Sequence, residues 1–174
     1  LPNLSAAVCG ACHREEYAEW KVSTHARAWM DDLQFQAELH KSTPEADVSW
    51  MCVNCHTPAE AQLPRLVARL EGGRVDRPVY VDNPEYDEAL QLEAITCITC
   101  HMRDGEVLGP YGDTESVHGA VKSDLLTTEA ICVRCHQARA RFPDVDLVCV
   151  FDTGAEFAGS PYKAEGKACQ SCHM

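Results

Sequence analysis

The sequence predicts a mostly α, irregular fold with one short β-hairpin. Stretches without Gly or Pro carry apolar residues at helical spacing, and the clearest runs from Glu15 to Leu39. A Gly72-Gly73 pair between two apolar runs is typical of a hairpin turn. Aromatic residues make up only 7% of the 174 residues, which leaves few large side chains to fill a core.

The first predicted helix, Glu15 to Leu39, ends before Ser42-Thr43-Pro44, a sequence typical of a loop. The next segment, Ala59 to Leu70, is mixed and is broken by Pro64. The apolar stripe of the first helix comprises Tyr17, Trp20, Ala28, Trp29, Leu33 and Phe35.

Later elements are shorter. The predicted hairpin joins Leu66–Leu70 to Val75–Val81, and a helix runs from Asn83-Pro84 to Ile95. The remaining predictions are a loop over Gly105–Gly112, a helix from about Thr128, a strand over Asp146–Phe151 and helical structure from Gly154 to Met174.

Five Cys-x-x-Cys-His pentapeptides occupy ten of the eleven cysteines and five of the eight histidines. This motif is typical of covalent haem c attachment. The two thiols bond the porphyrin, and the following imidazole is the proximal ligand of its iron. The predicted attachment residues are Cys9, Cys12, Cys52, Cys55, Cys97, Cys100, Cys132, Cys135, Cys169 and Cys172. The predicted proximal ligands are His13, His56, His101, His136 and His173.

Cys-x-x-Cys pairs also occur in zinc sites and in disulfides. Zinc ribbons combine such pairs two at a time, so five pairs would leave one over. Neither alternative explains a His after every second Cys. The sequence therefore predicts a chain that carries five haems c and their iron.

Five haems would share one chain, with about 35 residues for each. We therefore expect a single pentahaem domain over residues 1–174, a multihaem cytochrome c fold with the haems as its core. Packing this dense brings neighbouring porphyrins close enough for electrons to pass between them.

The formal net charge of −12 argues against nucleic acid and anionic membrane surfaces as partners. It would attract a basic redox partner, and it also keeps a protein soluble. No apolar run approaches the roughly 18 residues of a membrane span. The chain starts at Leu1 without a charged signal region, which suggests a processed form. Because covalent haem attachment takes place outside the cytoplasmic membrane, we expect a periplasmic or extracellular protein.

Three histidines remain for the distal side of the haems: His25, His40 and His118. His13 and His25 on one continuous helix would lie about 18 Å apart, too far to ligate one iron. His25 is therefore expected to serve a haem attached elsewhere in the chain or on another subunit. His40 lies between Glu38 and Lys41, a more exposed setting. At least two irons then have no distal histidine.

Methionines and one tyrosine are the other distal candidates. Glu156-Phe157-x-x-Ser160-Pro161-Tyr162 repeats the pattern of Glu16 to His25, and Ser116-Val117-His118 shares its Ser-x-His core. Tyr162 would then stand where His25 and His118 stand, either near an open iron or packed on a porphyrin. Met30, Met51, Met102 and Met174 are either ligands or core residues. Cys149, between valines, is typical of a buried, inert thiol.

Cys9-x-x-Cys12-His13 followed by Tyr17-x-x-Trp20-x-x-Ser23-x-His25-Ala26-x-Ala28 resembles the opening haem module of the cytochrome c554 family. Cys55-His56-Thr57-Pro58, Thr96 to His101, Ser116 to Gly119 and Cys169 to Met174 are similar to later modules. The resemblance implies stacked haem pairs, a mostly helical fold and electron transfer beside a larger oxidoreductase. It also implies that His25 and His118 are distal ligands and that one haem lacks a sixth ligand. The chain departs from the family in having five motifs rather than four and in Tyr162.

The main functional prediction is electron transfer through a chain of haems. One form of it is a subunit that stacks into an extracellular filament. A second hypothesis is a small haem oxidoreductase that acts on a nitrogen or sulfur compound near Tyr162. A third is the haem subunit of a membrane respiratory complex, with its anchor supplied by a partner.

Overall fold

The computed structural model describes residues 4–112, 115–145 and 147–174. The chain divides into two compact units, which are described separately. The first comprises residues 1–99 and 142–147, and the second comprises residues 100–141 and 148–174. The single domain predicted over residues 1–174 therefore stays a prediction.

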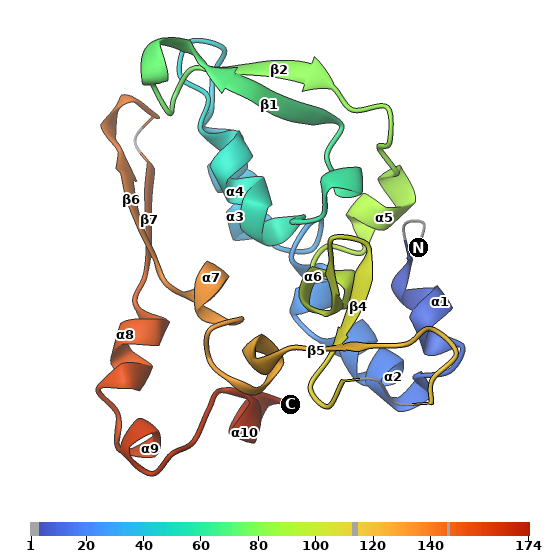
Figure 1. The fold of residues 1–174 in the computed structure, drawn as a ribbon. Coiled ribbons are helices and arrows are strands. Elements are labelled where there is room, and N and C mark those ends of the chain that lie inside the picture. The colour runs from blue at the N-terminus through green and yellow to red at the C-terminus, as the bar shows by residue number, and fades with distance from the viewer. Residues whose placement is uncertain (1–3, 113–114, 146) are drawn as a thin grey trace. The chain divides into compact units, whose positions relative to one another are not determined.

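The first unit contains short helices and one two-stranded sheet (Figure 1). Strands β1 (Arg65–Leu70) and β2 (Pro78–Asp82) pair antiparallel, with a register shift between Val67 and Arg69. The predicted hairpin is therefore confirmed. The helices are α1 (Ala6–Gly10), α2 (Arg14–Val22), η1 (His25–Arg27), α3 (Leu33–Leu39), α4 (Ser49–His56), η2 (Glu60–Gln62), η3 (Glu71–Gly73) and α5 (Glu88–Leu92).

The long helix predicted over Glu15–Leu39 is wrong, because the structure divides it into α2, η1 and α3. Ser23 ends α2, and its Oγ accepts a hydrogen bond from the Ala26 N–H at 3.3 Å. Asp32 then caps α3 by accepting from the Phe35 N–H at 2.9 Å. Ser and Asp side chains compete for backbone donors in this way and favour helix starts. The 18 Å separation expected between His13 and His25 assumed one helix and no longer applies.

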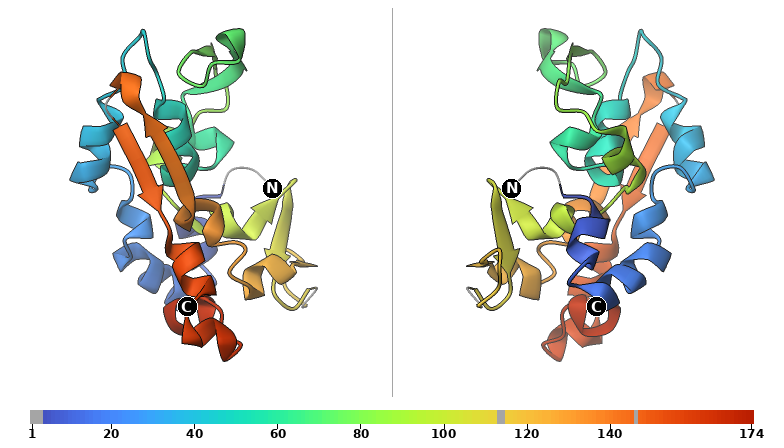
Figure 2. Two further views of the ribbon diagram at one scale, coloured as in Figure 1. Left: turned by 90° about the vertical axis from the view of Figure 1, so that its left-hand side faces the viewer. Right: turned by 90° about the vertical axis from the view of Figure 1, so that its right-hand side faces the viewer.

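The second unit combines small sheets with single-turn helices. Its helices are α7 (Val133–His136), α8 (Thr153–Ala158), α9 (Pro161–Ala164), α10 (Gln170–His173) and η4 (Asp124–Thr127), while α6 (Cys97–His101) crosses the boundary in sequence. One sheet has the order β3 (Met102–Arg103), β4 (Glu106–Gly109), β5 (Val121–Lys122). A second sheet pairs β6 (Ala138–Phe142) with β7 (Leu147–Phe151), and η5 (Pro143–Val145) connects them (Figure 2). Like α6, this hairpin crosses the boundary in sequence, because residues 142–147 belong to the first unit.

These sheets correct the prediction of a mostly α fold with one hairpin: the structure is mixed. The predicted loop over Gly105–Gly112 contains β4, which pairs antiparallel with β3. Asp104 and Gly105 form the turn, with φ of 52° and 80°. Asp-Gly is the dipeptide that favours two positive φ values in a hairpin, so this signal was present in the sequence. The strand expected over Asp146–Phe151 is confirmed as β7 from Leu147 onward, and Asp146 lies outside the described residues.

Three predicted helices are shorter than expected. The helix from Asn83-Pro84 to Ile95 is reduced to α5, because the Asn83 amide donates to the carbonyls of Glu60 and Leu63 and holds a turn. The helix from about Thr128 begins only at Val133. The last segment is divided into α8, α9 and α10.

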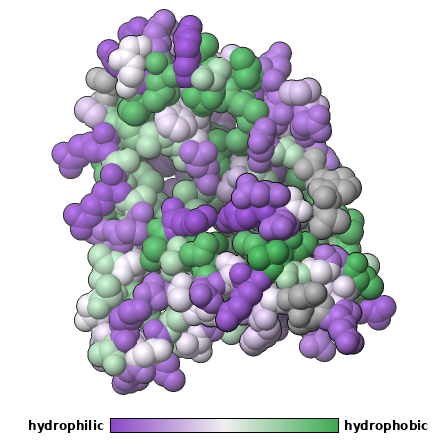
Figure 3. Space-filling model, in the orientation of Figure 1, coloured by the Kyte–Doolittle hydropathy of each residue, from purple (hydrophilic) through white to green (hydrophobic). Residues whose placement is uncertain are grey.

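Buried side chains gather in the first unit. Its buried apolar residues are Ala6, Phe35, Ala46, Val48, Ala61, Leu90, Ala94, Val145 and Leu147. Among the described residues of the second unit only Gly112 is buried. Large apolar side chains are instead exposed, and Val117 is 98% and Tyr111 85% accessible. Figure 3 shows such apolar residues interspersed with hydrophilic ones over the face of the molecule. The second unit has helices and sheets but almost no side-chain core.

Candidate haem-attachment sites

Each of the five motifs folds as one helical turn. The His13 N–H donates to the Cys9 carbonyl at 2.9 Å, and the corresponding bonds at His136 and His173 are 3.0 and 3.1 Å. The motif of Cys52 lies within α4 and that of Cys97 forms α6. Residues three and four positions apart share one side of a helix, so both thiols and the imidazole of each motif lie on the same side.

None of the eleven cysteines forms a disulfide. In the part of the chain that is described, no group of three or more His, Cys, Asp and Glu side chains is placed to hold a metal ion. Two side-chain oxygens of the described residues are buried without a hydrogen-bond partner, Thr99 Oγ1 and Gln170 Oε1. Thr99 lies between the two cysteines of the motif that begins at Cys97, and Gln170 between those of the motif that begins at Cys169. Cysteine pairs without a disulfide, these two oxygens and a second unit without a side-chain core fit a covalently attached porphyrin.

Two predicted proximal histidines have one ring nitrogen bound to a carbonyl. His56 Nδ1 lies 2.6 Å from the Ala28 oxygen, and His101 Nδ1 lies 3.0 Å from the Leu108 oxygen. An Nδ1–H donated to a carbonyl leaves Nε2 deprotonated and oriented as a metal ligand. Proteins commonly hold metal-binding histidines in this way.

Phe35 is a further residue of this site. Its ring stacks on the His56 imidazole, with centroids 3.6 Å apart and planes inclined by 7°. Phe35 is 7% exposed, so it fixes the ring plane from within the core. The sequence placed Phe35 in an apolar stripe and gave no sign of this contact, because α3 and α4 meet only in the tertiary structure.

The predicted distal histidines lie in three different settings. His40, which caps α3, has Nδ1 2.6 Å from the Gln36 carbonyl oxygen, the same arrangement as His56. The His25 carbonyl accepts from the Ile95 N–H at 3.2 Å, which puts its turn beside the motif that begins at Cys97. His118 is exposed, with Nδ1 near the Gly119 carbonyl and the Ser116 hydroxyl.

The first unit joins the motifs of Cys9 and Cys97. The Glu93 carboxylate accepts hydrogen bonds from the Ser5 hydroxyl and, at 2.7 Å, from the Ala6 N–H. The Trp20 indole donates to the Ile95 carbonyl at 2.8 Å. The thiols are neighbours as well. Burial, and after it the charge and hydrogen bond of the Cys9 thiol, raise the pKa of Cys97 to about 11.

The second unit joins the motifs of Cys132 and Cys169 in a similar way. The Gln170 amide donates to the Thr128 carbonyl at 2.6 Å and to the Leu126 carbonyl at 3.2 Å. Lys163 forms an ion pair with Glu129, three residues before Cys132. Burial, and then the Cys169 thiol, raise the pKa of Cys132 to about 11. Two motifs are thus held side by side in each unit.

The other candidate residues are spread over both units. Tyr162 is 60% exposed on α9. Met30 and Met174 are 56% and 89% exposed, whereas Met51 and Met102 are half-buried. Cys149 is half-buried on β7, and burial raises its pKa, in agreement with an inert thiol.

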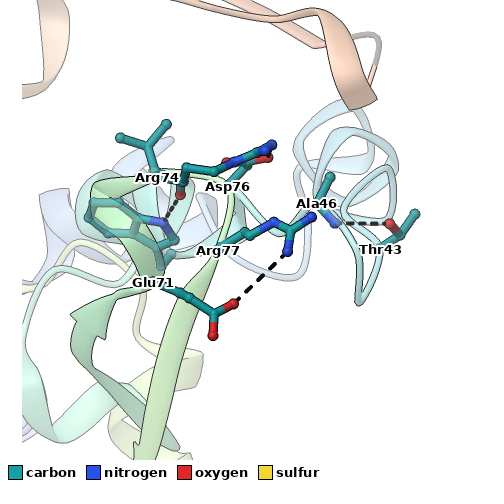
Figure 4. A network of polar contacts seen from close by, with 8 residues as sticks. Thr43, Ala46, Glu71, Arg74, Asp76 and Arg77 are labelled. Carbon is teal, nitrogen blue, oxygen red and sulfur yellow. Dashed lines mark hydrogen bonds and ion pairs between the residues drawn. The ribbon is translucent and has the colours of Figure 1, made fainter.

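A cavity of about 790 Å³ lies in the first unit. His40, Asp47, Arg65, Arg77 and Tyr80 line it, and no motif cysteine does. Figure 4 shows the polar contacts near this cavity. The Arg77 guanidinium forms an ion pair with the Glu71 carboxylate at 4.0 Å, and Thr43 and Ala46 form backbone hydrogen bonds with each other. A hydrogen bond of 2.8 Å from the Trp50 indole to the Val75 carbonyl ties α4 to the hairpin.

Comparison with protein families identifies the first part of the chain. Residues 8–72 match the family described as cytochrome c554 and c-prime. This part of the chain is similar to cytochromes c554. The resemblance read from the first module is therefore confirmed over the region that contains His25, His40 and the motifs of Cys9 and Cys52.

Cytochromes c carry covalently bound haem c and transfer electrons. The family match leaves three of the five motifs, those of Cys97, Cys132 and Cys169, outside it. Neither a curated protein nor a solved structure matches the chain. None of the described helices has the length and apolar character needed to cross a membrane.

Proposed function

We propose that the protein conducts electrons through five covalently bound haems c, one at each motif. The observation that carries this proposal is the set of hydrogen bonds that holds two motifs together in each unit. Haems attached to adjacent motifs are close neighbours, and short separations between haems are what electron transfer requires. The haem supplies the change of oxidation state, and the chain orients each ring and shields it from water.

The chain's residues have three roles in this proposal. The ten motif cysteines anchor the porphyrins, and His13, His56, His101, His136 and His173 are the proximal ligands. His25, His40 and His118 are distal ligands. For His40 the support is its Nδ1 contact with the Gln36 carbonyl, which leaves Nε2 for iron.

Because such attachment takes place after export, we propose a periplasmic or extracellular location with redox proteins as partners. Assembly into a filament is a separate proposal. Its support is the exposure of Cys172 and His173, which would put the last haem at the surface of its unit. Electron microscopy at working concentration tests it, and a monodisperse monomer would contradict it. Co-purification tests whether the chain belongs to a larger respiratory complex.

The haem count tests the proposal directly. Protein produced with export and haem-attachment machinery should carry five haems per chain by intact mass and by pyridine haemochrome absorbance, and should accept five electrons per chain in coulometry. Changing both Cys169 and Cys172 to Ala should remove one haem. Cys149→Ala is the matched control and should keep all five. Fewer than five haems in the wild type would overturn the pentahaem assignment.

A further inference from the structure

Residues 93–96 connect α5 to the third motif (residues 97–101) through a tight turn. Glu93 caps the end of α5, and the next residue, Ala94, has a positive φ of 53°. Glycine usually adopts this conformation after a helix, because a Cβ is strained there. Ala94 is 0% exposed, and its carbonyl accepts a hydrogen bond from the Gln62 amide at 2.7 Å. The core therefore holds the turn that carries Glu93.

The Glu93 carboxylate contacts the segments that lead into two motifs. One of its oxygens accepts from the Ser5 hydroxyl. The other accepts from the Ala6 N–H at 2.7 Å and from the Thr96 hydroxyl at 3.1 Å. Ser5 and Ala6 begin α1, which leads into the first motif (residues 9–13), and Thr96 directly precedes the third. The first N–H groups of a helix have no acceptor within it, so the carboxylate supplies one.

The same segment also contacts the chain that follows the first motif. The Trp20 indole donates to the Ile95 carbonyl at 2.8 Å, and the Ile95 N–H donates to the His25 carbonyl at 3.2 Å. Trp20 and His25 follow the first motif in the sequence, whereas Ser5 and Ala6 precede it. The segment is thus fastened to the chain on both sides of the first motif, and this fixes the spacing between the two motifs.

Glu93 brings a negative charge to this contact. It is half-buried, and a charge partly removed from water acts on its neighbours more strongly than an exposed one. Oxidation adds a positive charge to a haem iron, so a nearby carboxylate stabilises the ferric state and lowers the reduction potential. The side chain that joins two motifs in the second unit is the amide of Gln170, which is neutral.

We propose that Glu93 is a positioning residue that holds the first and third motifs at a fixed spacing and lowers the reduction potentials of their two haems. This inference rests on the covalent haems of the proposed function. The positioning follows from the hydrogen bonds to both segments, and the lower potentials follow from the half-buried charge. Electrons pass from haems of lower potential to haems of higher potential, so the charge favours transfer out of this pair.

Glu93→Gln tests the role of the charge, because it removes the charge and keeps the shape. The amide oxygen can accept from the Ala6 N–H and the Thr96 hydroxyl, and the amide N–H can donate to the Ser5 oxygen, so all five haems should still attach. In a potentiometric titration followed by visible absorbance, two of the five one-electron steps should shift to more positive potential. Glu88→Gln is the matched control: it removes the same charge at an exposed position of α5 and should titrate like the wild type.

Glu93→Ala tests the positioning, because it removes the hydrogen bonds as well. Electron paramagnetic resonance of the oxidised protein should show weaker magnetic coupling between two haems in Glu93→Ala and the wild-type spectrum in Glu93→Gln. Haem content is measured first by intact mass. If Glu93→Ala loses a haem, Ser5→Ala, which removes one of the three hydrogen bonds, takes its place and should weaken the coupling to a smaller extent.

Two results would overturn this inference and leave the proposed function intact. One is a set of potentials in Glu93→Gln equal to that of Glu88→Gln, with five haems in both. The other is an unchanged magnetic coupling when the hydrogen bonds of Glu93 are removed. Wild-type protein with fewer than five haems would instead contradict the proposed function.

Discussion

A single hydrogen bond decides which nitrogen of an imidazole can meet an iron. His40, His56 and His101 each have Nδ1 against a backbone carbonyl, at 2.6, 2.6 and 3.0 Å. His56 and His101 were expected as ligands because of their motifs, whereas His40 had no motif and was expected in an exposed setting. In the structure, His40 has the same contact between Nδ1 and a backbone carbonyl as the two predicted proximal histidines. This shared contact is the reason to propose His40 as a ligand.

Tyr80 should make stability depend on pH at the alkaline end. Burial, and then its hydrogen bond to Asp47 at 2.8 Å, raise its pKa to about 12 from an ordinary value of 10.0. The neutral phenol is thus favoured in the folded state, so its contribution is complete below pH 10 and is lost as the pH rises through about 12. Urea unfolding followed by circular dichroism should show a fall in the free energy of unfolding over this interval.

Tyr80→Phe should reduce that fall, because no proton is then released at position 80. Tyr111, which is 85% exposed, is the matched control, and Tyr111→Phe should retain the wild-type decline. An unchanged pH profile in Tyr80→Phe would contradict the assignment.

At the scale of elements, single polar side chains hold short helices together. The α-helices of the described chain have between four and nine residues, too few to be stable alone. The fully buried Gln62 of η2 is an example of such a side chain. Its amide donates to the carbonyls of Leu90 and Ala94, at 2.8 and 2.7 Å, and its oxygen accepts from the Ala59 N–H. One side chain thus satisfies backbone groups at the end of α5 and at the start of η2.

Replacing Gln62 by Leu should lower the free energy of unfolding by about 2 to 4 kcal/mol, because it leaves buried carbonyl and N–H groups without partners. Urea unfolding of the haem-loaded protein measures this. Gln34→Leu, at an exposed position of α3, should change stability by less than about 0.5 kcal/mol. Equal stability of the two variants would show that the buried hydrogen bonds contribute little.

The predictions from sequence succeeded where a local rule sufficed. The β1–β2 hairpin followed from Gly72-Gly73, and β7 followed from its apolar run. The helix predicted over Glu15–Leu39 is wrong, because the side chains of Ser23 and Asp32 accept hydrogen bonds from backbone N–H groups and start new helices. The contacts of Phe35 with His56 and of Glu93 with Ser5 join segments distant in the sequence, and no local pattern predicts them.

At the scale of the whole molecule, the two units differ in how many of their described side chains are buried. All the fully buried polar side chains, such as Gln62 and Thr57, lie with the apolar core in the first unit. Among the described residues of the second unit, no side chain is buried to that extent. Folding must remove apolar surface from water to offset the loss of chain entropy. Under the proposed function, porphyrins supply most of the apolar contacts of the second unit.

A chain in which all ten motif cysteines are changed to Ala should not fold cooperatively. The second unit would lose its apolar filling, and we expect a broad urea transition with little near-ultraviolet circular dichroism. The Cys149→Ala variant, which keeps every attachment site, should unfold like the wild type. A sharp transition in the haem-free chain would show that the side chains alone suffice.

The sequence by itself predicts the chemistry proposed for this protein, because covalent haem attachment depends on residue types at fixed spacing within five residues. Ten thiols, five adjacent histidines and a deficit of distal histidines can all be counted along the chain. Only the tertiary structure decided which motifs are neighbours and which imidazole nitrogens lie against a backbone carbonyl. These depend on contacts between segments up to 88 residues apart, such as Ser5 with Glu93, which form only when the chain folds.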